Sequence, residues 1–212
     1  MPIYGDLYFR TRHSQTAMSV GIKESNILMF GFLSKKKTLN DVGHKLFSIV
    51  IEQSRAAIFY SELAVEDSLD GRFDLMSLHM AMILQKLDQN KLDKDTVKLK
   101  QIVQEIMFDN LDLTLREVGV GDLGVGKKIK VMAEAFYGRM MVYQGLFGSK
   151  DLHEMTSALQ RNLYREKDVA PEILTAMTQY VYDQNGQIEN QDMANIMTGD
   201  VSFFVPTGIQ ND

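Results

Sequence analysis

The sequence predicts an all-α fold, a single-domain bundle of about six to seven helices with a loose N-terminal extension. Apolar residues recur at intervals of three and four along most of the chain from residue 38 onward, which is the spacing of one helix face. No two segments show the alternation of apolar and polar residues that paired strands require. With 212 residues and a 45% hydrophobic composition, the chain is long enough to bury one core.

Composition excludes several kinds of chemistry. The chain has no cysteine, so disulfides, thiolate metal sites and a cysteine nucleophile are excluded. No apolar run approaches the roughly 20 residues of a membrane-spanning helix. The net charge of -5 is unevenly distributed, because residues 168–212 hold seven acidic residues and no Lys or Arg. This acidic end, and the lack of a strongly basic stripe elsewhere, argue against nucleic-acid binding.

The N-terminal segment differs from the rest of the chain. We predict a flexible extension over residues 1–28 and a helical domain over residues 29–212, because residues 1–26 show no sustained period. Residues 27–33 are apolar and are followed by Ser34 and three lysines, an apolar patch with a basic collar. One interpretation is a short packing segment, and the other is peripheral contact with a membrane.

The first predicted helices carry start signals and a clear apolar face. Thr38 and Asp41 resemble a capping box for a helix that ends near residue 55. Residues 56–72 form an irregular link with one helical turn near residues 59–63. Asp74 is predicted to cap the next helix, which is apolar almost all round and therefore buried.

The second half of the chain continues the helical pattern. A long helix over residues 93–118 ends at Gly119, as helices often end at glycine. Pro171 suits the first turn of a later helix, where its missing N–H costs nothing. The remaining expected elements are helices over residues 124–147, after Ser149 and near residues 191–197, and one strand-like segment at residues 201–205.

A glycine-rich turn joins two of these helices and nearly matches a phosphate-binding loop. Residues 121–128, GDLGVGKK, have the glycine spacing and the lysine of that loop, but Lys128 stands where Ser or Thr would hold magnesium. Because the preceding segment is helical, we interpret the turn as a helix–helix corner. Gly119 ends one helix and Asp122 caps the next. The structural turn residues are Gly119, Gly121, Gly124 and Gly126, of which the last two would let another backbone approach closely.

Three lysines follow the turn. Lys127, Lys128 and Lys130 lie in the first turns of the predicted helix, where the helix dipole disfavours cations. An acidic partner or an anion would explain their position, and a solvated basic face is the alternative.

Candidate catalytic and ligand-binding groups are few. Glu105, Asp109 and Asp112 share a helix face, but no Glu-x-x-His motif accompanies them, so we predict a solvated acidic face and no metal site. His79 lies in the apolar helix and is interpreted as a hydrogen-bonded core residue, with haem ligation as the alternative. No nucleophile motif is present, so we predict a non-enzymatic protein without a cofactor. The 14 methionines suit either a core or an adaptable surface for apolar partners.

Residues 115–139, LREVGVGDLGVGKKIKVMAEAFYGR, closely resemble the signature region of the ubiquinol-cytochrome c chaperone family. Phe59 and Tyr60, the segment DSLDGRFD at residues 67–74, and the spacing from residue 38 to about residue 204 are similar too. The resemblance covers about four-fifths of the chain and leaves out residues 1–28.

The resemblance implies an all-helical, non-enzymatic assembly factor for respiratory complex III, and the chain looks like a bacterial member. The implied client is cytochrome b or a complex III assembly intermediate, with a small protein partner or a second copy as further partners. The implied location is the cytoplasm, with peripheral contact at the cytoplasmic face of the inner membrane. The alternatives are a helical protein that binds haem or a quinone, and a generic interaction scaffold.

We predict that the surface around the two signature helices binds the client. Phe136 and Met140 are expected in the core. The predicted partner-binding residues are Asp112, Arg116, Asp122, Lys127, Lys128, Tyr137 and Arg139.

Overall fold

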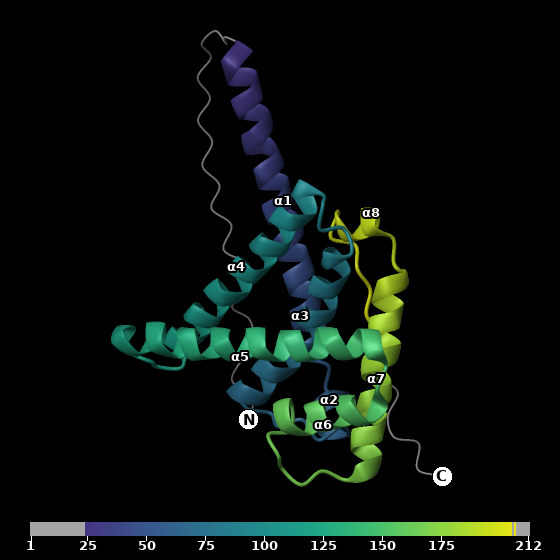
Figure 1. The fold of residues 1–212 in the computed structure, drawn as a ribbon. Coiled ribbons are helices and arrows are strands. Elements are labelled where there is room, and N and C mark those ends of the chain that lie inside the picture. Colours follow the sequence, from purple (N-terminus) through teal and green to yellow (C-terminus); the bar gives the residue numbers. More distant parts are fainter. Residues whose placement is uncertain (1–23, 205, 207–212) are drawn as a thin grey trace. The chain divides into compact units, whose positions relative to one another are not determined.

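The computed structural model describes residues 24–204 and 206, with side chains from residue 38 onward. Within residues 24–204 it contains eight helical segments and no strand (Figure 1), which confirms the all-α prediction. Residues 201–204, which have strand-like composition, are irregular. The chain divides into two compact units, Met1–Lys35 and Lys36–Asp212, and the description below concerns the second. Most of the predicted extension, and the side chains of the apolar patch with its lysine collar, lie outside the described residues.

The helices follow one another with short connections. Their bounds are α1 Glu24–Ser54, α2 Ile58–Ser61, α3 Leu69–Asp88, α4 Lys94–Glu117, α5 Asp122–Ser149, α6 Leu152–Asn162, α7 Pro171–Asn190 and α8 Met193–Ile196.

Two predicted helix starts are wrong. Thr38 lies inside α1, because the helix begins at Glu24 and no proline lies between these two residues. Asp74 does not cap α3, because the Ser68 side chain does so by accepting a hydrogen bond from the Gly71 N–H at 3.1 Å. Asp74 therefore falls within the helix, where it is wholly buried.

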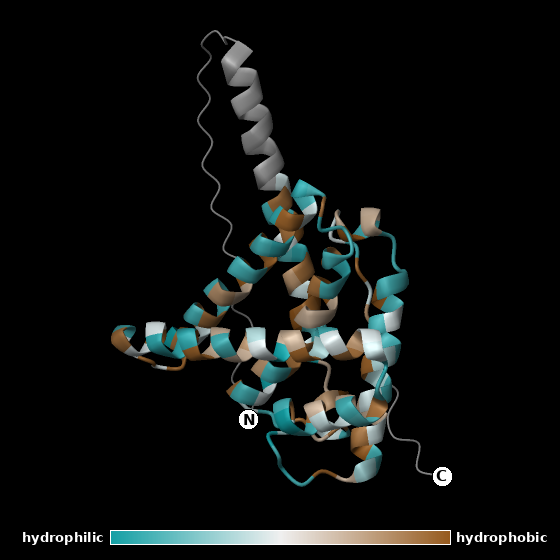
Figure 2. Ribbon diagram, in the orientation of Figure 1, coloured by the Kyte–Doolittle hydropathy of each residue, from teal (hydrophilic) through white to brown (hydrophobic). Residues whose placement is uncertain are grey.

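Helix α3 forms the centre of the second unit. From Phe73 to Leu84 every residue is buried, as the prediction of a buried helix required. It packs against α4, α5 and α7, and α6 packs against α5 and α7. The buried apolar residues of α3 and of these neighbours belong to one cluster, and Figure 2 colours the helices by hydropathy. The core is thus built around one helix that is apolar on nearly all sides.

The C-terminal part of α1 completes the core with an apolar face of Leu39, Val42, Leu46 and Val50. At Gly43 the helix lies so close to α4 that a Cβ atom would be 2.6 Å from Cγ2 of Ile102. The close approach of α1 to α4 therefore requires glycine at this position.

His79 connects α1, α3 and α7 inside the core. Its Nδ1 lies 2.8 Å from the Ser54 hydroxyl oxygen, and its Nε2 lies 2.7 Å from the Tyr180 hydroxyl oxygen. Burial lowers the pKa of His79 to about 3, so the ring is neutral near neutral pH. These contacts confirm the interpretation of His79 as a hydrogen-bonded core residue. Haem ligation by this histidine would require breaking one of its two hydrogen bonds.

Candidate functional site

The glycine-rich turn forms a corner between α4 and α5, and we call residues 112–131 the α4–α5 corner. Gly119 has a φ of 87°, a left-handed conformation that glycine adopts without strain. Its N–H donates to the Arg116 carbonyl oxygen, and the Val120 N–H donates to the Leu115 carbonyl oxygen, both at 3.0 Å. This is the Schellman arrangement, and it confirms that Gly119 ends the helix.

The phosphate-loop pattern does not form a phosphate-binding loop. Gly124, Gly126 and Lys127 all lie within α5, so their backbone N–H groups are committed to the helix rather than turned around an anion. Two details of our corner interpretation are wrong. Gly121 occupies the capping position and Asp122 makes no capping hydrogen bond. Cβ atoms at Gly121 and Gly126 would meet nothing within 4 Å, and one at Gly124 would meet only the Val120 side chain, so no other backbone approaches these glycines.

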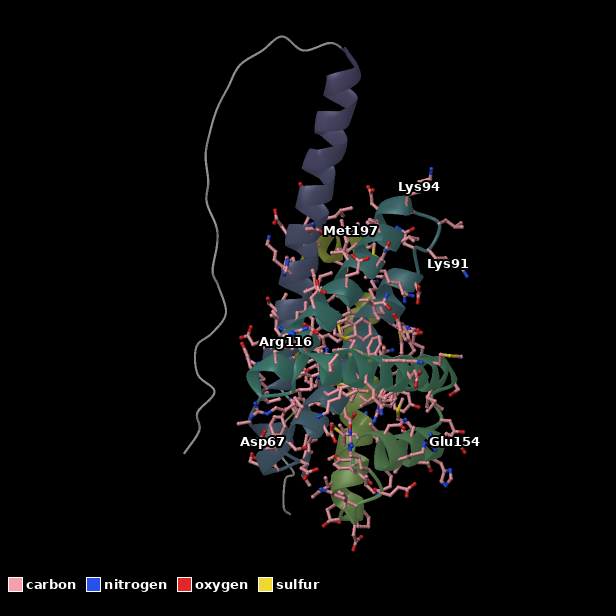
Figure 3. The ribbon with its side chains drawn as sticks, turned by 90° about the vertical axis from the view of Figure 1, so that its left-hand side faces the viewer. Asp67, Lys91, Lys94, Arg116, Glu154 and Met197 are labelled. Atoms are coloured by element: carbon pink, nitrogen blue, oxygen red, sulfur yellow. The ribbon has the colours of Figure 1, made fainter. Side chains whose placement is uncertain are left out.

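Asp122 instead forms an ion pair across the turn. Nε of Arg116 lies 2.7 Å from Oδ1 of Asp112 on the same helix, and Nη1 of Arg116 contacts Oδ1 of Asp122 at the start of α5. Figure 3, which faces this corner, labels Arg116. The structure therefore brings together three of the predicted partner-binding residues. All three side chains are at least one-third exposed, so the pairs contribute little to stability.

The three lysines of α5 are exposed and make no ion pair with any residue in the described part of the chain. The nearby acidic residues do not form a metal site. Within the part of the chain that the structure describes, no three His, Cys, Asp or Glu side chains are placed to hold a metal ion.

Arg139 is placed differently from the other predicted partner-binding residues. Its Nη2 lies 2.9 Å from Oδ1 of Asp74, its Nε donates to the Asn162 carbonyl oxygen at 3.3 Å, and its guanidinium lies over the Phe73 ring. Arg165 reaches the same carboxylate, since its Nε donates to Oδ2 of Asp74 at 2.7 Å. Burial raises the pKa of Asp74, and the two guanidinium groups oppose that shift. Arg139 thus holds α5 against α3.

Sequence reasoning missed this cluster. Asp74 was interpreted as a cap, and Arg165 was not singled out. The available signal was an aspartate followed by an almost continuous apolar helix, because a buried carboxylate needs a cationic partner.

Tyr137 lies on the flank of α5 that faces α4. It is exposed, and its ring contacts those of Phe108 and Phe136. Phe136 is fully buried and Met140 packs against the core, as predicted. Tyr137, Phe108 and Val97 line an open groove of about 430 Å³ between α4 and α5, together with Lys100, Gln101, Gln104 and Glu105.

Comparison with known proteins identifies a family and a related solved structure. The family model described as ubiquinol-cytochrome C chaperone matches residues 61–203. The chain belongs to this family. A crystal structure of the Cbp3 homolog from Brucella abortus matches with a TM-score of 0.73 and 26% sequence identity, over 84% of this chain and 96% of that chain. The search of curated protein sequences gave no significant match.

Membership of the ubiquinol-cytochrome C chaperone family supports a role in the assembly of complex III and implies a non-enzymatic protein. The matched range includes both DSLDGRFD and the glycine-rich corner. Within the described residues, no helix combines the length and the apolar character needed to cross a bilayer.

Proposed function

We propose that this protein is a chaperone that binds an apolar helical segment of cytochrome b, or of a complex III assembly intermediate, on the outward face of α5. We define this outward face by Tyr137, Gly138, Met141, Gly145 and Gly148, which follow one another at helical spacing and are all exposed. Met141 is 73% exposed. An exposed methionine beside an aromatic ring provides an adaptable contact for apolar side chains.

The glycines of this face carry the proposal. A Cβ atom at Gly138, Gly145 or Gly148 would meet nothing within 4 Å, so the fold itself does not require glycine there. Each glycine inside a helix costs about 1 kcal/mol relative to alanine. Small residues allow two helix backbones to approach closely, which is how many membrane-spanning helices pack together. A client helix seated on α5 would use the space that these glycines leave.

The core positions on the other side of α5 keep this face outward. Val125, Phe136, Tyr143 and Phe147 are buried at helical spacing. The ion pair between Arg139 of α5 and Asp74 of α3 fixes the rotation of α5 about its axis. The client face is therefore rigid before a client arrives, which lowers the entropic cost of binding.

The decisive experiment combines deletion with crosslinking. In a strain that lacks the gene, we expect loss of the haem b absorbance of complex III and failure of its assembly. A photo-crosslinker at position 141 should capture cytochrome b or an assembly intermediate from membranes. A crosslinker at Leu152, an apolar residue of α6 that is 58% exposed, is the control. Normal complex III in the deletion strain would reject the proposal, and capture of unrelated proteins at position 141 would favour a generic scaffold.

A further inference from the structure

The α4–α5 corner carries apolar and basic side chains that the fold does not use. Leu123, in the first turn of α5, is 100% exposed. Leu113 on α4 and Val118, which follows the last residue of α4, are also exposed. Figure 1 shows the corner at the end of α4 and α5 that lies away from α3 and α7, and Figure 2 shows hydrophobic colouring there. A group of exposed apolar side chains at one corner, unlike a single exposed residue, indicates a surface that binds something else.

Two acidic residues of the corner form ion pairs, whereas its lysines form none within the described residues. Its acidic residues Asp112 and Asp122 are both engaged by Arg116, and Glu117 is the remaining acid of the corner. From residue 123 to residue 133 the sequence holds three lysines and no Asp or Glu. Glu134 follows one turn later on the same face. The start of α5 is therefore a short cationic segment whose charges are not neutralised by ion pairs within the described residues.

Leu123, Lys127 and Lys130 lie on one side of α5, because they follow at intervals of four and three. The groove between α4 and α5 is lined by six residues of α4 from Val97 to Phe108 and by Tyr137, and includes no residue of the corner. The corner is thus a projection that carries an exposed leucine, and two lysines follow it on the same side of α5. A rigid protein partner would need a matching hollow for it, whereas a bilayer interface accepts such a projection without one.

We infer that the α4–α5 corner is a membrane-contact element: Leu123, with Leu113 and Val118, enters the interface of a bilayer, and Lys127 and Lys130 contact anionic lipid headgroups. The lysine side chains are long enough to stay at headgroup level while the leucine inserts. This surface is separate from the outward face of α5, which lies farther along the helix. Lipid binding can therefore be measured without a client.

The contact is expected to be weak and reversible. Each lysine near an anionic surface strengthens binding by roughly fivefold, and one leucine side chain in the interface by roughly tenfold or more. Binding should also weaken with salt, because the lysines are exposed and are screened within about 10 Å at 0.1 M ionic strength.

The test uses the full chain and lipid vesicles without any client. The protein has no tryptophan, so Leu123→Trp places a single fluorescent reporter at the corner. With phosphatidylcholine vesicles that contain phosphatidylglycerol, we expect a blue shift of its emission and quenching by brominated lipid. Leu152→Trp, in a segment flanked by Asp151 and Glu154, is the control and should show neither.

Sedimentation with the same vesicles tests the charges. Lys127→Gln/Lys130→Gln should lower the partition constant between vesicles and solution by roughly 25-fold, the product of two fivefold effects. Lys45→Gln/Lys150→Gln, which makes the same change in net charge at two exposed lysines outside the corner, should not. The inference is overturned if the reporter at position 123 is unaffected by anionic vesicles, or if both lysine pairs change binding equally. It is also overturned if position 123 responds only when a protein partner is added.

Discussion

Nη2 of Arg139 in α5 lies 2.9 Å from Oδ1 of Asp74 in α3, and Asp74 is wholly buried. These two residues are the last of the segment LREVGVGDLGVGKKIKVMAEAFYGR and the last of DSLDGRFD, the two segments that carry the family resemblance. The motifs therefore meet in space as a buried ion pair. Arg139 of the signature region therefore maintains the fold, whereas Asp122, the three lysines of α5 and Tyr137 are exposed.

We expect Asp74→Ala to lower the free energy of unfolding by about 3–5 kcal/mol, because it leaves the partly buried Arg139 without its acidic partner. Urea unfolding followed by circular dichroism measures this change. Asp67→Ala is the matched control, since Asp67 pairs with Arg72 at the surface and its loss should cost less than about 1 kcal/mol. An equal decrease in the free energy of unfolding in the two variants would show that the buried ion pair contributes no more to stability than the exposed one.

His79 should make stability depend on pH. The folded protein holds the pKa of His79 at about 3, below its ordinary value of 6.5, so the unfolded chain binds this proton first as the pH falls. The contribution of His79 is complete above pH 6.5 and is lost between pH 6.5 and about pH 3. The expected slope is on the order of 1 kcal/mol per pH unit below about pH 6.

The measurement compares urea unfolding of the wild type and His79→Gln at several pH values. His79→Gln is less stable at neutral pH, but its stability should fall less steeply with acid. His153→Gln, at an exposed histidine, should keep the slope of the wild type. A slope that His79→Gln leaves unchanged would assign the acid sensitivity to other groups.

The sequence pattern predicted the helices well where a single residue determines the local structure. Pro171 begins α7 and Gly119 ends α4, because a fixed φ and a left-handed φ leave few alternatives. The buried character of α3 was also predictable, because apolar residues on all sides of a helix have no other stable place.

The contacts between distant residues were not predictable. Arg139 and Arg165 reach Asp74 only because α5 and the connection after α6 fold back over α3. Asp122 has the chemistry of a cap, but Arg116 competes for its carboxylate from across the turn. The local spacing of residues cannot show which partner a side chain takes when the stronger interaction comes from another element. The start of α1 was missed for a related reason, since a plausible cap at Thr38 lies within a longer helix.

Glycines of the two motifs should respond oppositely to alanine. At Gly71 a Cβ atom would lie 2.0 Å from the Glu66 carbonyl oxygen, so Gly71→Ala should lower the free energy of unfolding by at least about 2 kcal/mol. At Gly138 the Cβ position is open, so Gly138→Ala should raise it by about 0.5–1 kcal/mol. Thermal unfolding of the two variants tests both signs. Destabilisation by Gly138→Ala would mean that the fold needs this glycine, and would remove the main support for a client on α5.

Substitutions on the outward face of α5 should impair complex III assembly without lowering the stability of the fold. We expect Gly138→Leu and Met141→Asp to keep the stability of the wild type within about 1 kcal/mol, because neither side chain enters the core. Gly138→Leu fills the space for a client helix, and Met141→Asp places a charge that an apolar client would have to desolvate. Each variant should therefore lower the amount of complex III in a strain that depends on it, as measured by haem b absorbance. Leu152→Asp makes a similar change on α6 and should support normal assembly. If Leu152→Asp impaired assembly as strongly as Met141→Asp, the loss would reflect a general surface effect, and α5 would no longer be the client site.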